Sequence, residues 1–288
     1  MSPGRCPYAP RGSLGVPIEM LQECAKKNQY ADCDGPRRYD RRRLMNLILL
    51  ASGEVDSAQT VRLSGDRARH LRDVLRVTPG QPVRIGIIDG PFGIGTVRTV
   101  GHDFVDLACT FDDGVPLRPP VDLVLAVPRP KVLRRLWAQL AAMGVGRVML
   151  TNAARVERNY FDTHWLSSMT YEPLLIEGLQ QARDTRLPVV SIHRQFRPLI
   201  EDELGTATPE TLRITAHPGV GGPLGDQVRE RAPQRVLLAI GPEGGWNEFE
   251  MSLLAANGFL TASMGPRTLR TDTACVAALA AVHAGLGR

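Results

Sequence analysis

The sequence predicts an α/β protein in which a small β-rich unit precedes a parallel-sheet domain. Two observations predict the larger domain. The unbroken apolar run at 121–127 is typical of a buried strand, and apolar residues at 132–143 recur with helical spacing ahead of a further strand at 147–151. A strand–helix–strand order implies a parallel sheet covered by helices. A third observation predicts the small unit: short strand-like runs at 46–115 are separated by turn dipeptides.

The first 44 residues differ in composition from the rest of the chain. Nine basic and five acidic residues stand between Met1 and Met45, whereas the chain as a whole carries a formal charge of only +5. Charged termini without hydrophobic periodicity are usually disordered tails, which is the interpretation we favour. Three alternatives stay open: an RNA-binding arm, an organellar presequence, and a start codon upstream of a true first residue at Met45. Presequences are poor in acids, and this segment is not.

The small unit is placed at residues 45–117. Its expected strands are 45–52, 83–88, 95–100 and 104–111. A helix is expected at 68–77, where apolar residues repeat with helical spacing. The proline-rich stretch at 115–120 is stiff and extended, so the boundary between the two domains is placed there.

The larger domain is placed at residues 118–288. Helices are expected at 132–143, 167–183 and 271–283, and Gly144 is expected to end the first of them. The expected strands are 121–127, 147–151, 188–192, 212–216, 235–240 and 259–264.

Cysteine usage and hydropathy bound the class of protein. The five cysteines are an odd number and form no CxxC pair, so reduced thiols are favoured over a disulfide framework or a zinc site. No apolar run approaches the length needed to cross a bilayer, and we expect a soluble, cytoplasmic protein without membrane contact. Basic and acidic residues nearly balance after Met45, so total charge is weak evidence for a nucleic-acid partner.

Three predicted strands near the C-terminus end in loops rich in glycine and proline. The loops are 217–219 (HPG), 241–245 (GPEGG) and 265–270 (GPRTLR). In a parallel sheet they emerge together at the carboxyl edge, where open α/β sheets bind ligands. Glycines let the main chain approach a ligand, and main-chain N–H and C=O groups suit an adenine edge. No Gly-Lys-Ser/Thr follows, so a phosphate-binding P-loop is a poor match. GPEGG alone would be equally compatible with a tight turn.

The residues around these loops resemble one protein family. The matching segments are 237–245 (LLAIGPEGG), Glu248 with Glu250, 258–259 (GF) and 264–274 (MGPRTLRTDTA). They closely resemble the signature of the ribosomal RNA small-subunit methyltransferase E family, the 16S rRNA uracil-N3 methyltransferases. Similarity runs from about Met45 to the end and includes 140–146 (LAAMGVG) and 177–188 (EGLQQARDTRLP).

The resemblance carries expectations about fold and chemistry. It implies a SPOUT-class fold, in which a PUA-like β-barrel precedes a trefoil-knotted α/β methyltransferase domain. Knotted chains are too rare for pattern reasoning to propose one. It also implies a homodimer, no metal, S-adenosylmethionine held by the three loops, and 16S rRNA of the small ribosomal subunit as partner. The residues expected to bind the cofactor are His217, Pro218, Ile240, Gly241, Pro242, Glu243, Gly244, Gly245, Met264, Gly265, Leu269, Arg270, Thr273 and Ala274.

Three positions depart from the family pattern. Asp272 replaces the usual glutamate of the LRTET-A stretch, and Trp246 is bulkier than the residue that tends to follow GPEGG. The first loop continues as Gly-Val-Gly-Gly at 219–222. These departures bear on substrate fit and cofactor affinity and not on the class of enzyme.

Arg270 and Glu243 are the catalytic candidates. Uracil N3 carries a proton that must leave before or during attack on the methyl group. A guanidinium stays charged and can fork to O2 or O4, so we expect Arg270 to stabilise the developing oxyanion. The alternative is a salt bridge from Arg270 to Asp272 or Glu243 that only shapes the loop. Glu243 as the base is weaker, because it could simply cap the following helix.

Two other reactive residues have structural interpretations. His217 could contact the cofactor, but a single loop histidine is more often a structural hydrogen-bonding residue. Cys275 falls within the last predicted helix and has no evident base partner, so we expect it in the core.

RNA contacts are expected from basic residues of both domains, although a single arginine is usually a solvated surface charge. The sharper expectation is a cluster near the carboxyl edge of the sheet. The target base must be unpaired or flipped, because N3 is buried in a Watson–Crick pair. The residues are Arg62, Arg72, Arg76, Arg129, Lys131, Arg183 and Arg186.

Two rival functions are compatible with parts of the sequence. A Rossmann-type enzyme would place GxGxxG after the first strand of the larger domain, where the sequence has Pro-Arg-Pro-Lys at 128–131. Gly90, Gly93 and Gly95 fall between predicted strands of the small unit and indicate a hairpin. The second rival is a non-catalytic RNA-binding ribosome-assembly factor with the same fold.

Overall fold

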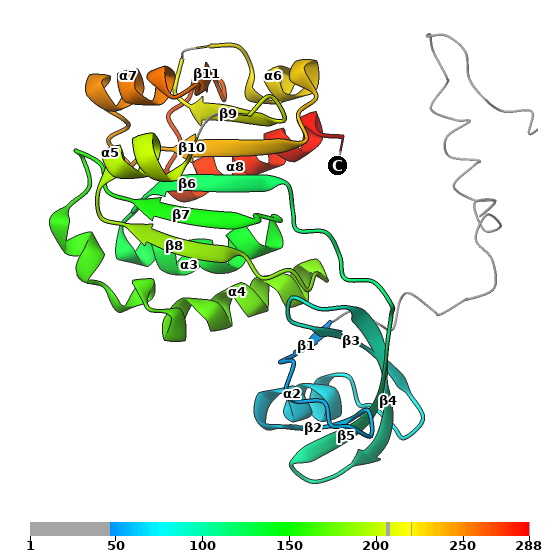
Figure 1. Cartoon of the computed structure of the whole chain (residues 1–288). Helices are drawn as coiled ribbons and strands as arrows, with labels where there is room; N and C mark the ends of the chain where they lie inside the picture. Colours follow the sequence, from blue (N-terminus) through cyan, green and yellow to red (C-terminus); the bar gives the residue numbers. More distant parts are fainter. Residues whose placement is uncertain (1–46, 206–207, 220, 288) are drawn as a thin grey trace, which may run out of the picture. The chain divides into compact units, whose positions relative to one another are not determined.

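The computed structural model describes residues 47–205, 208–219 and 221–287 (Figure 1). The predictions for residues 1–44 lie outside the described residues. The described residues form a five-stranded sheet and a six-stranded sheet. Each sheet contributes to its own cluster of buried apolar side chains.

The smaller sheet is mixed and has the order β1-β3-β4-β5-β2. β1 pairs in parallel with β3, and the remaining pairs are antiparallel. Gly90, Gly93 and Gly95 lie in the β3–β4 hairpin, as the sequence predicts. The predicted helix at 68–77 begins three residues earlier and is completed by a π-helical turn, η1. The elements are β1 (Ile48–Leu50), β2 (Thr60–Ser64), α2 (Gly65–Arg69), η1 (His70–Val74), β3 (Pro82–Ile87), β4 (Phe92–Val100) and β5 (Phe104–Phe111).

β1 contributes side chains to both hydrophobic cores. Successive side chains of a strand point to opposite faces. Ile48 and Leu50 are buried in the core of the smaller sheet, whereas Leu47, just before the strand, and Leu49 are buried in the core of the parallel sheet. A single extended segment therefore supplies apolar side chains to both clusters.

The larger sheet is wholly parallel and has the order β11-β9-β10-β6-β7-β8. β9 lies between β11 and β10, so the carboxyl ends of the last three strands are adjacent. The prediction of a parallel sheet is confirmed. The strands are β6 (Val121–Ala126), β7 (Arg147–Thr151), β8 (Val189–His193), β9 (Thr211–Ala216), β10 (Arg235–Ile240) and β11 (Leu260–Ala262).

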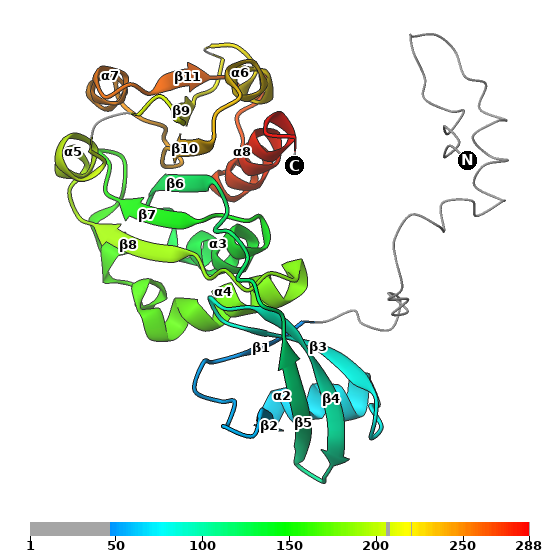
Figure 2. The same cartoon turned by 45° about the vertical axis from the view of Figure 1, so that its right-hand side comes forward.

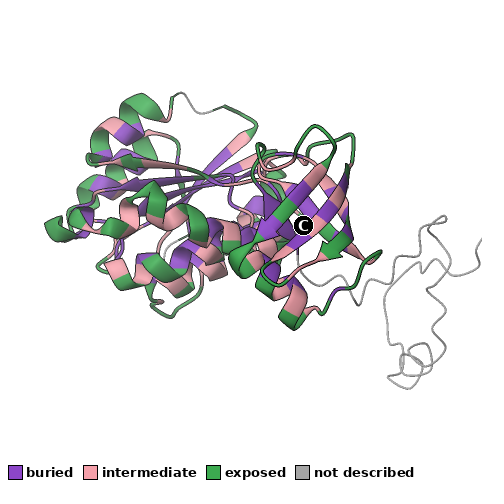
Figure 3. Ribbon diagram, turned by 90° about the horizontal axis from the view of Figure 1, so that it is seen from below, coloured by how far each residue is buried: buried purple, intermediate pink, exposed green. Residues whose placement is uncertain are grey.

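Helices cover both faces of this sheet. α3 (Pro130–Ala142), α4 (Ser168–Ala182), α6 (Leu224–Arg231) and α8 (Thr271–Gly285) pack side by side over one face. The other face carries α5 (Phe196–Pro198), its continuation η4 (Leu199–Glu203), and α7 (Glu248–Ala256), as Figure 2 shows. Two short 3-10 turns, η2 (Arg158–Asp162) and η3 (His164–Leu166), precede α4. Figure 3 shows that buried residues concentrate in the strands and on the inward faces of the helices.

The α3–α4 contact depends on a glycine. Leu133, Leu136, Trp137 and Leu140 of α3 are fully buried, as their helical spacing predicts. On α4, Gly178 lies so close to α3 that a Cβ there would overlap the carbonyl group of Ala138. The absence of a side chain at Gly178 therefore sets how closely the two helices pack.

Two buried cysteines are expected to resist alkylation. Cys275 is 0% exposed and Cys109 is 5% exposed, and burial raises the pKa of both thiols above the ordinary value. Because the thiolate is the reactive form, we expect native protein treated with iodoacetamide at pH 8 to remain unmodified at both positions. Mass spectrometry of the two peptides should show full modification only after denaturation. Rapid labelling of native Cys275 would contradict its placement in the core.

None of the helices formed by the described residues is both long and apolar enough to span a bilayer.

Candidate functional site

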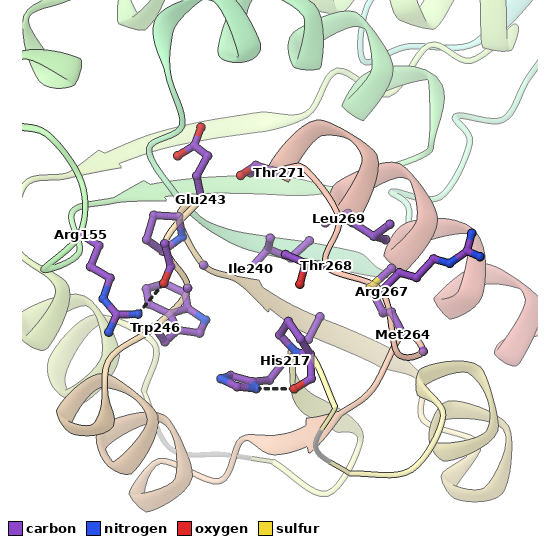
Figure 4. A pocket seen from close by; sticks show the side chains of 18 residues that line it. Arg155, His217, Ile240, Glu243, Trp246, Met264, Arg267, Thr268, Leu269 and Thr271 are labelled. Atoms are coloured by element: carbon purple, nitrogen blue, oxygen red, sulfur yellow. Dashed lines mark hydrogen bonds between the residues drawn. The ribbon is translucent and has the colours of Figure 1, made fainter.

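A cavity of about 310 Å³ opens at the carboxyl edge of the parallel sheet (Figure 4). Its walls come from the ends of β9 and β10, from the chain after β11, and from the start of α8. The three loops that the sequence singled out thus meet around one space. This volume falls at the lower end of the range for small-molecule sites, roughly 300–1,000 Å³.

Most of the residues expected to bind a cofactor line this cavity. The exceptions are Arg270, which directly follows the cavity-lining Leu269, and Thr273, which directly precedes the cavity-lining Ala274. The expected residues that line it are His217, Pro218, Ile240, Gly241, Pro242, Glu243, Gly244, Gly245, Met264, Gly265, Leu269 and Ala274.

Six lining residues were not among the expected ones. Five of them adjoin or lie within the singled-out loops: Ala216, Trp246, Arg267, Thr268 and Thr271. Arg155 comes from elsewhere, in the loop after β7. The same edge rule applies to that loop, because it also follows the carboxyl end of a parallel strand.

Arg155 packs against the GPEGG loop. Its Nη1 donates a hydrogen bond to the carbonyl oxygen of Gly244. A Cβ on Gly244 would lie 2.9 Å from Cδ of Arg155, so the guanidinium stem occupies the space that a larger residue would need. In Figure 4, Arg155 and Trp246 lie on one side of the cavity, across from Met264 and Leu269.

A buried carboxylate holds the Arg155 loop and the GPEGG loop together. Glu250 is 3% exposed. Its Oε1 accepts a hydrogen bond from the Ala154 N–H at 2.6 Å, and its Oε2 accepts one from the Asn247 N–H at 2.8 Å. Asn247 in turn accepts from the Glu250 N–H, which completes a capping box at the start of α7. One side chain therefore ties the chain after β7 to the chain after β10.

Replacing Glu250 with glutamine tests this tie. An amide has one acceptor oxygen, so either the Ala154 N–H or the Asn247 N–H would face an NH₂ group and stay unpaired. Leaving a buried donor unsatisfied costs about 1–3 kcal/mol, and we expect Glu250→Gln to lose that much unfolding free energy in urea. Glu248→Gln, on the exposed first turn of the same helix, is the matched control and should change little. If the two substitutions lowered the free energy of unfolding equally, Glu250 would not be the residue that holds the two loops together.

Glu243 does not cap the helix that follows it. That alternative is wrong because Asn247 and Glu250 cap α7. Oε1 of Glu243 instead accepts a hydrogen bond from the main-chain N–H of Arg129 at 3.2 Å. Arg129 is the residue before α3, so Glu243 links the second loop to the end of β6.

Arg270 forms no ion pair with Asp272 or Glu243. Asp272 instead pairs with Arg135 of α3, with 2.6 Å between Nη2 and Oδ2. The Arg270 side chain is exposed and has no hydrogen-bond or ion-pair partner among the described residues. Its chain neighbours Leu269 and Thr271 both line the cavity. Arg270 therefore stands at the cavity rim with a free guanidinium group, and the salt-bridge alternative does not describe it.

The remaining lining residues are suited to a neutral, flat ligand with acceptor atoms. Nε1 of Trp246 is buried in the cavity wall and has no acceptor among the described residues. The indole is 4% exposed and stacks on Phe196 with 5.0 Å between ring centroids. Apolar side chains such as Ile240, Met264 and Leu269 face the same space. His217 lies at the opening, where its Nδ1 is 3.1 Å from the carbonyl oxygen of Pro218.

The basic residues expected to contact RNA do not form one cluster. Arg129 and Lys131 follow the carboxyl end of β6, whereas Arg183 and Arg186 precede the amino end of β8. The four thus lie at opposite edges of the sheet.

Several of these cations are already paired. Arg62 pairs with Asp106 and stacks on Phe104, and Arg72 pairs with Asp73. Arg186 donates to the carbonyl oxygen of Asp89 at 3.0 Å. Arg76, Arg129, Lys131 and Arg183 are exposed.

Within the part of the chain that the structure describes, no group of three or more His, Cys, Asp or Glu side chains could hold a metal ion.

The sequence matches the RNA methyltransferase domain family over residues 116–283. It is 30% identical over 248 residues to the ribosomal RNA small subunit methyltransferase E of Treponema pallidum, which covers 83% of this chain and 91% of that protein. Its counterpart in Synechocystis is 29% identical over 247 residues, covering 84% of this chain and 78% of that protein.

Solved structures share the fold. The ribosomal RNA small subunit methyltransferase E of Neisseria gonorrhoeae, bound to S-adenosyl methionine, superposes with a TM-score of 0.66 at 21% identity, over 83% of this chain and 97% of that one. A putative methyltransferase of Legionella pneumophila in complex with the same cofactor gives 0.65 at 23% identity, over 84% and 97%. Together with the match of residues 116–283, the 30% identity to the Treponema pallidum protein over 83% of this chain places the chain in the ribosomal RNA small subunit methyltransferase E family.

Proposed function

We propose that this protein transfers the methyl group of S-adenosylmethionine to N3 of a uridine in 16S ribosomal RNA. The observation that carries the proposal is the meeting of the three loops after β9, β10 and β11 around one cavity lined by apolar side chains and main chain. Family membership supplies the reaction class, and the S-adenosylmethionine bound by the two solved structures supplies the donor.

The cavity residues fit the parts of such a donor. Main chain at Gly241 to Gly245 can meet the neutral edge of the adenine, and Ile240, Met264 and Leu269 can pack on its faces. The unpartnered Nε1 of Trp246 can donate to a ring nitrogen or a ribose oxygen. When bound, the sulfonium centre supplies an activated methyl group for in-line displacement. The walls exclude water and fix the direction of approach.

Arg270 is the residue we assign to the acceptor base. Its free guanidinium at the rim can donate to O2 or O4 of uracil, where negative charge develops as the N3 proton leaves. Glu243 has one oxygen engaged by the Arg129 N–H and a second oxygen available at the same rim. It can orient the base or accept the N3 proton. A target uridine would reach these groups only when unpaired or flipped.

Exposed Arg129 and Lys131 are the RNA contacts that best suit this arrangement, because both follow the carboxyl end of β6 at the edge that holds the cavity. Phosphate contacts position the nucleic acid without reading its sequence. Arg76 and Arg183 would then contact more distant parts of the RNA.

The family resemblance extends the proposal to features of the whole protein. We expect a trefoil-knotted backbone around β9 to β11, a PUA-like barrel in the smaller sheet, and a metal-independent homodimer that acts in the cytoplasm. Size-exclusion chromatography with light scattering would test the dimer. Activity in the presence of EDTA would test metal independence.

Mapping of modified nucleotides tests the function directly. Mass spectrometry of 16S rRNA from cells with and without the gene should show one N3-methyluridine that disappears on deletion. Purified protein with S-adenosylmethionine should restore it to small subunits from the deletion strain. Binding of ribosomal RNA without methyl transfer, and without binding of S-adenosylmethionine, would instead identify a non-catalytic assembly factor.

A further inference from the structure

A second cavity, about 460 Å³ in volume, lies on the α5 side of the parallel sheet. Most of its strand residues stand at or near the start of a strand, with Asp122 of β6, Arg147 of β7 and Arg235 of β10 among them. His193 at the end of β8 also lines it, and η4 contributes to one side. The first cavity lies at the other ends of the strands. From Arg235 to Ile240 along β10 the separation is about 16 Å at the rise of a strand. The second cavity, which we call the amino-edge cup, is therefore distinct from the methyl-donor site.

Three guanidinium groups line the amino-edge cup, and two of them share one carboxylate. Asp122 is 3% exposed and pairs with Arg147 at 2.8 Å and with Arg235 at 3.0 Å. The three residues come from adjacent strands, so the pairing is fixed by the sheet. The single negative charge of Asp122 is therefore shared between two guanidinium groups.

Arg213, the third guanidinium, has no acidic partner among the described residues. It is 5% exposed and donates to the carbonyl oxygens of Leu204 at 3.0 Å, Gly205 at 2.8 Å and Asn257 at 3.1 Å. Carbonyl oxygens at chain turns carry partial charge only. Its Nε is buried without an acceptor among the described residues, and burial lowers the pKa of the guanidinium. A buried cation of this kind lacks the full negative charge that usually accompanies it.

The other acid of the cup is already engaged. Oε2 of Glu203 lies 2.9 Å from Nδ1 of His193, and the second ring nitrogen of His193 lies 2.7 Å from Oγ of Ser191. Glu203 therefore does not neutralise Arg213. The lining as a whole carries an excess of positive charge around an open space.

We propose that the amino-edge cup binds a phosphate group. Arginines from β7, β9 and β10 line the space, and a phosphate group offers negatively charged oxygens in several directions. A carboxylate would meet only part of this set. The phosphate can belong to the RNA backbone or to a free phosphorylated ligand, and the experiment below separates these sources.

Titration with inorganic pyrophosphate tests the proposal. Calorimetry is done on the full chain with saturating S-adenosylmethionine, so that the first cavity does not contribute. Arg147→Gln should weaken pyrophosphate binding at least about tenfold, the worth of one charge-assisted hydrogen bond. Asp122→Asn should strengthen it, because both of its guanidinium partners are released. Arg229→Gln, on α6 and paired with Asp226 outside the cup, is the control and should match the unmodified protein.

The opposite signs expected for the two cup variants guard against misfolding, which would weaken binding in both. Unchanged affinity for S-adenosylmethionine in each variant checks the fold independently. Repeating the titration with a saturating short RNA separates the sources: competition identifies backbone phosphate, and its absence identifies a free ligand. No binding of pyrophosphate by the unmodified protein, or equal binding by Arg147→Gln, would overturn the proposal.

Discussion

Substituting Arg270 with alanine is expected to lower methyl transfer to ribosomal RNA by roughly 10²–10³-fold, the usual effect of removing one donor from a developing oxyanion. The side chain is exposed at the cavity rim and has no partner among the described residues, so its removal breaks no internal contact. Affinity for S-adenosylmethionine, measured by calorimetry, should stay within about threefold, because Arg270 does not line the cavity. The rate is measured with labelled S-adenosylmethionine on small subunits that lack the modification.

Two further variants separate catalysis from simple charge loss. Arg270→Lys keeps the positive charge but loses the planar fork, and we expect it to recover only part of the rate. Arg229→Ala removes a surface arginine of α6 and should leave the rate unchanged. A fully active Arg270→Ala protein would show that Arg270 does not stabilise the charge that develops on the uracil.

Replacing Gly178 with valine is expected to have the largest effect on stability. A side chain at this position would collide with the carbonyl group of Ala138 on α3, and both atoms belong to packed helices that cannot yield locally. Overpacking of this kind costs about 3 kcal/mol at the upper end of its usual range. For a domain of 150–250 residues that corresponds to a fall in Tm of roughly 6–12 °C. Differential scanning fluorimetry would measure it.

Gly53→Val provides the matched control. A Cβ at Gly53 would meet no atom within 4 Å, so the same substitution should leave Tm nearly unchanged. Because glycine within a helix is otherwise unfavourable by about 0.5–1 kcal/mol relative to alanine, a rise in Tm for Gly178→Val would show that the helices are free to separate.

The carboxyl-edge rule accounts for how much of the site could be predicted. Gly241, Gly265 and His217 all follow strands, and once the sheet is parallel their loops must meet. The same rule covers Arg155, but its loop after β7 carries no glycine–proline signature to draw notice. The separation of Arg129 from Arg183 follows equally from topology, because α4 runs back to the amino edge before β8 begins.

The length of the hydrophobic pattern explains why some helices can be predicted from the sequence and others cannot. Helix α3 was predicted because its apolar residues recur over thirteen positions. Helices α6 and α7 have eight and nine residues, too few for a period to stand out. The capping box of Asn247 and Glu250 is a recognisable start signal for α7. The ion pair of Asp272 with Arg135 joins residues far apart in the chain, and only the fold could reveal it.

Because β1 supplies side chains to both hydrophobic cores, the packing of one core depends on the packing of the other. Were this strand to slip by one residue, Ile48 and Leu49 would exchange surroundings, and each interior would lose the side chains it needs at the same moment. Neither sheet can therefore complete its packing while the other is misaligned. A small sheet that shares a strand with the core of its neighbour in this way cannot be removed or exchanged without disturbing the packing of the domain that holds the cavity.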